Sequence, residues 1–350
     1  MIRKGSLALA LAVGAAGACS SSSSSRLRDA DAAAGTGGIG GGARVDGAGG
    51  SAASGGSGTS GASGASGGPP DASGGSLGVG DDAATSRCNR SRPFDAPRPL
   101  EGVNSPADET LGWMSPDGLT FYFGSLRSAQ GADIYRASRN LVSDVFSMPV
   151  ALPAPVNSAG DEGDPKLSSN GLTLFFSRGD DIYVATRPTA IADFTNVGPV
   201  SNVNSTAGDW VGSLSESGER LYFQTTREGA SKIYVAVLGT SGSFGMPTPV
   251  GELNSTSSQD IAPTVTPDTL TIYFGSTRSA AGTKGAADIF VAHRSTTNDG
   301  FGAPAVVPEL NSAINEAPSW VSADDCEIIL TRRSTGVPTE RDYFIAARPK

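Results

Sequence analysis

Five carboxylates stand at equivalent places in five similar segments of the chain, and they are the residues with the clearest chemical potential. Each lies six residues before a turn; they are Glu109, Glu162, Asp209, Asp260 and Glu316. Carboxylate oxygens are good ligands for calcium and good partners for basic peptides. A fold that places the five segments around one axis would gather these acids into a ring. The sequence therefore presents a candidate binding ring.

An arginine near the end of the following strand gives each carboxylate a possible partner within its own segment. These arginines are Arg127, Arg178, Arg227, Arg278 and Arg333. Two roles are open for the ring: binding of a cation or basic peptide, or internal pairing of each acid with an arginine. Trp113 and Trp320 share one phase of the first strand and Trp210 follows its acid, which suits either ligand contact or core packing.

Enzyme chemistry has little support in the sequence. His293 is the only histidine, no Cys/His cluster has the spacing of a metal site, and no nucleophile motif such as G-x-S-x-G appears. Glycoside hydrolysis needs two carboxyl groups in different environments. Acids repeated in the same phrase predict equal environments, so we expect a protein that is not an enzyme. A glycosidase that uses two of these carboxylates is the alternative.

The segments that carry the acids are internal repeats. The first is ETLGWMSPDGLTFYFGSLRSAQGADIYRA, Glu109 to Ala137, with a Ser-Pro-Asp-Gly turn followed by two aromatic and β-branched strands. Four more copies follow, and a second phrase, from an aromatic residue to Asn-Ser, recurs between them and predicts a fourth, outer strand. Repeats of about fifty residues with four antiparallel strands are typical of propeller blades. We predict an all-β, five-bladed β-propeller.

The ends of the repeat region predict how the ring closes. The fifth unit ends at Lys350 without an outer-strand phrase, and a spare copy, Phe94 to Ser105, stands before the first unit. We therefore expect the N-terminal strand to complete the last blade, which leaves no exposed sheet edge.

The repeat resembles the TolB-type, WD-like propeller repeats of bacterial envelope proteins, in the form E-x-x-P-x-x-SPDG-x-x-LYF-x-S-x-R…DIY. The third unit departs from it with Lys232 in place of the aspartate, and the fifth lacks the turn glycine. The resemblance implies a propeller of the cell envelope. It does not fix the activity, because such repeats occur in translocation-linked, peptidoglycan-associated and enzyme-docking propellers, and five-bladed propellers similar to arabinanases are glycosidases.

The N-terminal region predicts export and a lipid anchor. Residues 1–19 hold Arg3, Lys4 and a short apolar run that ends at Gly17-Ala18-Cys19, which resembles a lipobox with Cys19 as the lipidated residue. Ser20 after this cysteine favours outer-membrane sorting by the same resemblance. Residues 20–86 are rich in Ser, Gly and Ala and predict a disordered linker, so the propeller domain occupies residues 87–350.

The net charge limits the classes of partner that the protein could bind. The net charge of -9 disfavours nucleic acid, because phosphate contact needs a basic face. We expect a monomer that meets the membrane only through its lipid anchor and binds a protein, peptidoglycan or other glycan at the acidic rim. No cofactor is expected, although calcium in the central channel is compatible with the acids. A purely structural envelope spacer is a further alternative.

The two remaining cysteines predict a disulfide at the closure. Cys88 precedes the N-terminal outer strand, and Cys326 opens the second strand of the fifth unit. In an antiparallel blade these two strands run in the same direction, so both cysteines fall at the same end, one intervening strand apart. Loose residues around Cys88 could cross that gap in an oxidising compartment.

Overall fold

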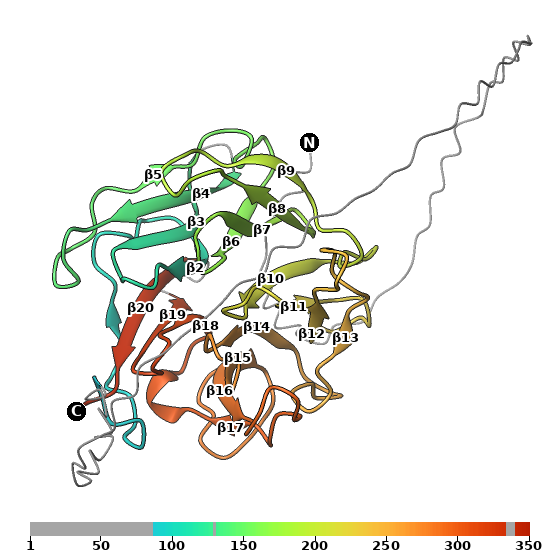
Figure 1. The fold of residues 1–350 in the computed structure, drawn as a ribbon. Coiled ribbons are helices and arrows are strands. Elements are labelled where there is room, and N and C mark those ends of the chain that lie inside the picture. The colour runs from blue at the N-terminus through green and yellow to red at the C-terminus, as the bar shows by residue number, and fades with distance from the viewer. Residues whose placement is uncertain (1–86, 129–130, 334–339) are drawn as a thin grey trace, which may run out of the picture. The chain divides into compact units, whose positions relative to one another are not determined.

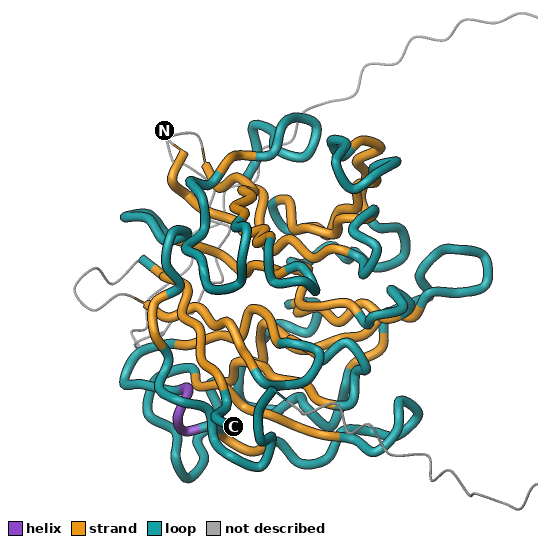
Figure 2. Tube along the Cα trace, turned by 60° about the vertical axis from the view of Figure 1, so that its left-hand side comes forward, coloured by secondary structure: helices purple, strands orange, loops and turns teal. Residues whose placement is uncertain are grey.

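The computed structural model describes residues 87–128, 131–333 and 340–350, and these form five four-stranded antiparallel sheets. The predicted signal peptide, Cys19 and the predicted linker of residues 20–86 lie outside the described residues. Within the described ranges, the only helical element is the short turn η1 (Pro308–Leu310), which Figure 2 shows against the strands and loops. No helix in this part of the chain is long and apolar enough to cross a membrane.

Each sheet is one blade (Figure 1). In blades 1 to 4 the four strands are neighbours in the order in which they occur in the sequence, and the first of them is the innermost. Blade 1 consists of β2 (Glu109–Met114), β3 (Thr120–Ser128), β4 (Gly131–Ser138) and β5 (Val150–Ala151). Blade 2 consists of β6 (Glu162–Leu167), β7 (Thr173–Arg178), β8 (Asp181–Thr186) and β9 (Thr195–Pro199). Blade 3 consists of β10 (Asp209–Leu214), β11 (Arg220–Thr225), β12 (Lys232–Val237) and β13 (Thr248–Pro249). Blade 4 consists of β14 (Asp260–Val265), β15 (Thr271–Ser276), β16 (Asp288–His293) and β17 (Ala305–Val306). Blade 5 combines β18 (Glu316–Val321), β19 (Glu327–Arg333) and β20 (Arg341–Ala347) with the N-terminal β1 (Arg98–Pro99).

The turn between the first two strands of a blade explains why the repeat carries Ser-Pro-Asp-Gly. In blade 1 the Ser115 hydroxyl accepts the Thr120 amide at 2.8 Å, and the Gly118 amide donates to the Ser115 carbonyl at 2.8 Å. Gly118 has a φ of 70°, in the left-handed region that glycine adopts without steric cost. Blade 5 lacks the glycine, and Asp325 takes the same conformation with a φ of 55°. The turn is thus kept without the residue that suits it best.

The five innermost strands close into a ring. β2 contacts β6, β6 contacts β10, β10 contacts β14, β14 contacts β18, and β18 contacts β2. The last blade is completed by the N-terminal strand, because β1 pairs antiparallel with β20 through Arg98 opposite Ile345 and Pro99 opposite Phe344. The predicted five-bladed propeller and its shared last blade are confirmed.

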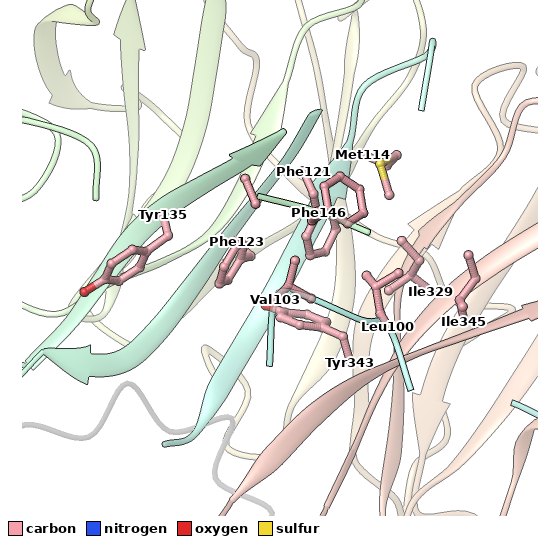
Figure 3. Close-up of a cluster of buried hydrophobic side chains, with 11 residues drawn as sticks. Leu100, Val103, Met114, Phe121, Phe123, Tyr135, Phe146, Ile329, Tyr343 and Ile345 are labelled. Atoms are coloured by element: carbon pink, nitrogen blue, oxygen red, sulfur yellow. The ribbon is translucent and has the colours of Figure 1, made fainter. Parts of the chain in front are cut away.

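Apolar packing between blades 1 and 5 also ties the two ends of the domain together (Figure 3). Leu100 and Val103 from the N-terminal segment pack with Phe121 and Phe123 of β3 and with Tyr343 of β20. The Tyr343 ring meets both phenylalanine rings edge-on, with centroids 5.1 Å and 5.7 Å away. Aromatic contacts of this kind stabilise by about 1 kcal/mol each beyond the burial of their surface. The seam between first and last blade is therefore packed as a core.

A disulfide lies at the same seam. A disulfide joins Cys88 and Cys326, whose Cα atoms are 5.6 Å apart and whose sequence separation is 238. The Asn89 amide donates to the Pro349 carbonyl at 2.9 Å, so the backbone beside Cys88 also bonds to the C-terminal segment. Covalent and non-covalent links thus join the same two ends of the chain.

We predict that this disulfide stabilises the closed ring. A bond that closes so long a loop contributes up to about 5 kcal/mol in the chain-entropy model. Thiol counting in denaturant on protein purified from an oxidising compartment should find neither Cys88 nor Cys326 free, and reduction should lower the melting temperature. Two reactive thiols beyond Cys19, or a melting temperature unchanged by reduction, would contradict this role.

Candidate functional site

The five carboxylates predicted as a ring are the first residues of the five innermost strands, and all are buried. Their exposed fractions are 0% for Glu109, Glu162, Asp209 and Asp260 and 1% for Glu316. Each forms an ion pair with an arginine that lies in the second strand of its own blade or two residues after that strand. The N–O distances are 3.1 Å for Glu109–Arg127, 2.8 Å for Glu162–Arg178, 2.7 Å for Asp209–Arg227, 2.5 Å for Asp260–Arg278 and 2.9 Å for Glu316–Arg332.

The partner in blade 5 corrects one sequence prediction, because it is Arg332 and not Arg333. The register of β18 and β19 places Glu316 opposite Arg332, as the register of blade 2 places Glu162 opposite Arg178. Neighbouring side chains on a strand point to opposite faces, so a shift of one residue turns Arg333 away from Glu316. The separation between acid and arginine is 16 residues in both blades, and that match is the signal that could have identified Arg332.

Each arginine is held by more than its carboxylate. In blade 1 the guanidinium of Arg127 lies 5.0 Å from the ring centroids of Phe123 and Tyr135, and it donates to the Val103 carbonyl at 2.5 Å. The other four arginines also stack on aromatic rings and donate to a backbone carbonyl of the incoming loop; they are Arg178, Arg227, Arg278 and Arg332. We call this arrangement of acid, arginine, aromatic rings and loop carbonyl the blade latch.

The recurring Asn-Ser dipeptide completes the latch, a role that the sequence analysis missed. Asn157 accepts the Ile134 amide at 2.8 Å and donates to the Ile134 carbonyl at 3.0 Å, which fixes it to the third strand of blade 1. Ser158, the next residue, donates its hydroxyl to Glu162 of blade 2 at 2.5 Å. Asparagines at the same place bond in the same way in all blades; they are Asn104, Asn157, Asn204, Asn254 and Asn311. The dipeptide thus joins each blade to the next.

This geometry accounts for the acidic ring through internal pairing. Burial raises the pKa of Glu109 and Glu316, and the serine and arginine contacts oppose that shift. Within residues 87–128, 131–333 and 340–350, no three His, Cys, Asp or Glu side chains are grouped so that they could hold a metal ion. Binding of calcium or a basic peptide at the ring stays a prediction.

We predict that neutralising one ring acid mainly destabilises the fold. Glu162→Gln leaves the half-buried Arg178 guanidinium, which stacks on aromatic rings, without its counter-charge, and this should cost up to about 3 kcal/mol of unfolding free energy. Asp117→Asn, at an exposed turn, is the matched control and should cost less than about 1 kcal/mol. Denaturant unfolding and a calcium titration of each protein distinguish a structural ring from a binding ring. A Glu162→Gln protein that is as stable as the parent but has lost calcium binding would assign the ring to binding.

A cleft lies at the other end of the innermost strands, where they lead into the Ser-Pro-Asp-Gly turns. It has a volume of about 420 Å³ and is lined by the half-buried indoles of Trp113 and Trp320 with apolar residues at the strand ends, among them Met114, Leu167, Leu214, Val321 and Pro267. We call it the turn-face cleft. Its size is that of a ligand pocket for a small molecule or for one or two side chains of a partner.

One position of the repeat lines the channel beneath this cleft in every blade. Four residues after each ring acid stand Trp113, Lys166, Ser213, Thr264 and Trp320, and all five line a smaller cavity of about 60 Å³. The two large indoles come from the adjacent blades 5 and 1, whereas the side chains of blades 3 and 4 are small. The shared phase of Trp113 and Trp320 was visible in the sequence, and the structure brings them to one cleft. Trp210 lies beside a ring acid at the opposite strand end and does not line this cleft.

Two aspartates of the turn-face cleft, Asp117 and Asp324, have lowered pKa values. The hydroxyl of Ser115 donates to Asp117 at 2.5 Å and lowers the pKa of Asp117. The guanidinium of Arg87 hydrogen-bonds to Asp324 at 2.7 Å and holds the pKa of Asp324 well below its ordinary range. A general acid needs a raised pKa to be protonated near neutral pH. Asp117 and Asp324 are therefore unsuited to donate a proton near neutral pH.

Lys166 ties three innermost strands together below the cleft. Its ammonium donates to the carbonyls of Gly112 on β2, at 2.5 Å, and Ser319 on β18, at 3.0 Å. Burial lowers the pKa of Lys166 to about 7, although the negative charge of Asp164 opposes the shift. The Lys166 side chain thus lies at the small cavity and links its own strand, β6, to β2 and β18.

We predict a pH dependence of stability from Lys166. Between pH 7 and 10 the unfolded chain keeps this lysine protonated, because its ordinary pKa is 10.5, while the folded protein releases the proton. Stability therefore rises with pH in this window, by up to about 1.4 kcal/mol per pH unit. The unfolding free energy of the parent, relative to that of Lys166→Met, should rise from pH 7.5 to 10. If the unfolding free energies of the parent and of Lys166→Met change in parallel with pH, Lys166 stays charged in the folded protein.

Among the comparisons with known proteins, only solved structures show a similarity to this chain. No protein-family model matches the chain, and no curated protein matches it. Similar solved structures include TolB from Acinetobacter baumannii, at 16% identity over 70% of this chain and 55% of that one, with a TM-score of 0.45. Others are the putative TolB from Agrobacterium tumefaciens, at 13% identity over 74% and 91% of the two chains (TM-score 0.42), and the catalytic domain of the Coprinopsis cinerea GH62 alpha-L-arabinofuranosidase, at 11% identity over 73% and 96% (TM-score 0.49). The chain spans about 55% of the length of the Acinetobacter protein.

Proposed function

We propose that this propeller is a binding module of the cell envelope for a protein or cell-wall component, and that its ligand occupies the turn-face cleft. The observation that carries the proposal is the pair of half-buried tryptophans, Trp113 and Trp320, in a cleft of about 420 Å³. Tryptophan faces that remain partly open in a cleft are the side chains most often found at the centre of binding sites. The acidic rim favoured by the sequence has no comparable open surface, because its acids are buried.

Glycoside hydrolysis is supported less well. The ring acids with raised pKa values, Glu109 and Glu316, are 0% and 1% exposed and lie at the far end of the strands from the turn-face cleft. The cleft carboxylates Asp117 and Asp324 have lowered pKa values. Hydrolysis needs both a protonated acid and a second carboxylate at one sugar ring, and these residues do not supply that pair in one place.

Placement in the envelope rests on the N-terminal residues. The short apolar run before Cys19 and the Ser-Gly-Ala-rich stretch after it support export, lipidation at Cys19 and a tether that holds the propeller off a membrane. Release of a Cys19→Ser variant from salt-washed membranes is the check on this part of the proposal.

We predict that ligand binding changes the fluorescence of the cleft tryptophans. The chain has three tryptophans, so Trp210→Phe leaves only the two in the cleft. Titration of this variant with soluble peptidoglycan fragments, and separately with detergent-solubilised envelope proteins, should give a saturable change. Trp113→Ala and Trp320→Ala should each weaken binding by about thirtyfold, the loss typical of a central aromatic contact.

The control is the fold of each tryptophan variant, followed by its thermal melt. Binding unaffected by both alanine substitutions, but lost in the ring variants, would move the site to the acidic rim. No saturable change with either preparation would favour a structural spacer.

A further inference from the structure

The loop that joins β4 to β5 in blade 1 exposes an unusual concentration of apolar side chains. The exposed fractions are 62% for Leu141, 52% for Val142, 57% for Val145 and 86% for Met148. We call these four residues the apolar loop. The described surface has nine large exposed hydrophobic residues, and these four, with Val150 at the start of β5, make up five of them within ten residues. Surface hydrophobic residues are common singly, whereas a cluster marks an interaction site.

The apolar loop has a defined conformation. The Asp144 amide donates to the Leu141 carbonyl at 2.9 Å, and the Leu141 amide donates to the Asp144 carboxylate at 3.0 Å. Arg139 stacks over the ring of Phe146 at 4.4 Å from its centroid and donates to the Gly118 carbonyl at 2.8 Å. These contacts fix the turn through polar and aromatic groups and leave the apolar side chains outside.

Blade 4 contains the same loop with polar or small residues at these four places. Residues 294–301 match residues 139–146 in length, and the Asp299 amide donates to the Thr296 carbonyl at 3.1 Å. The Thr296 amide donates to Asp299 at 2.8 Å, and Arg294 stacks over Phe301 at 4.5 Å. Thr296, Thr297, Gly300 and Ala303 stand where the apolar loop has its four hydrophobic residues. The fold therefore does not require those side chains to be apolar.

The apolar loop adjoins the turn-face cleft, because Val142 and Arg139 line that cleft. Asp117 and Glu216 line it as well and are exposed. The cations on this face are already engaged: Arg87 pairs with Asp324 at 2.7 Å, and Arg139 is stacked and hydrogen-bonded. Cleft and loop together present an apolar surface flanked by carboxylates that are open to a cationic partner.

We propose that the apolar loop and the turn-face cleft form one docking surface for a segment of a partner protein that carries apolar side chains flanked by lysine or arginine. This inference rests on the proposed binding function and specifies the ligand as a protein. Charge complementarity selects a basic segment, since Asp117 and Glu216 would meet its cations. A net charge of -9 opposes both an anionic lipid surface and a second copy of this chain.

The test replaces three residues of the apolar loop by threonine, which blade 4 has at the first two of these places. The variant is Leu141→Thr/Val142→Thr/Val145→Thr, and the matched control is Ile191→Thr, which removes an isolated side chain, 94% exposed, from the corresponding loop of blade 2. Full-length protein is panned against a phage-displayed random dodecapeptide library. Enriched peptides should combine apolar residues with lysine or arginine, bind the parent and the control equally, and bind the triple variant at least tenfold more weakly. The double variant Asp117→Asn/Glu216→Gln should also bind the peptides more weakly than the parent, and this loss should be larger in low salt than in high salt.

Other outcomes overturn the inference. Peptides that bind the triple variant as well as the parent, acidic enriched peptides, or no enrichment would each reject it. In a Cys19→Ser background, sedimentation of the protein with the parent loop, but not of the triple variant, with phosphatidylethanolamine–phosphatidylglycerol vesicles would assign the loop to a lipid surface. Loop-dependent dimerisation would assign it to self-association. If peptidoglycan fragments still change the cleft fluorescence while no peptide binds, this inference fails and the proposed binding function stands.

Discussion

The blade latch is the interaction on which the rest of the structure depends. A guanidinium taken out of water is costly unless its charge and its N–H groups are all matched, and each latch supplies a carboxylate, a loop carbonyl and aromatic faces. Removal of any one partner leaves a buried group unmatched, so the parts hold only together. Since the carbonyl and the Asn-Ser dipeptide come from the loop that leaves the preceding blade, each latch fixes two blades at once. In blade 1 the preceding strand is β1, and the Val103 carbonyl extends the same arrangement across the closure.

The repeat made the fold predictable, and its irregularities explain where prediction failed. Turn chemistry, alternating strands and the displaced outer-strand phrase are local signals, so the five blades and the shared last blade followed from them. The arginine of blade 5 was misassigned because β-sheet register turns on a single residue. The bonding of Asn157 and Ser158 was missed because a short polar pair before a strand reads as an ordinary loop. The turn-face cleft was missed because Leu167 or Leu214 looks the same in sequence whether it fills a core or lines an opening.

The inner strands carry a second irregularity that the repeat alone does not explain. The inner strand of every blade has a register shift before the channel position, and in blades 2 and 4 Asp164 and Ala262 also have a φ of 51°. Such a backbone is strained for any residue other than glycine, by about 1 kcal/mol or more. Asp164 partly offsets this through the Leu111 amide, which donates to it at 3.0 Å, and through the Ser177 hydroxyl at 3.0 Å. The bulge sets the position of Lys166, and Lys166 in turn links β2 and β18. The strained backbone at Asp164 thus lies two residues before the lysine that links the innermost strands of three blades.

Five copies of one unit allow structural and functional constraints to be separated within a single chain. Positions that all blades share, such as the ring acid and the asparagine, are accounted for by hydrogen bonds and ion pairs that every blade makes. Positions that differ while the backbone stays the same cannot be explained in that way. Trp113 and Trp320 occupy a channel position that Ser213 and Thr264 fill elsewhere, and Leu141 stands where blade 4 has Thr296. Leu141 is exposed, whereas Trp113 and Trp320 are half-buried and also pack against hydrophobic clusters of their blades. Because the two departures lie on one face, around one cleft, the ligand that we propose for that cleft would account for both.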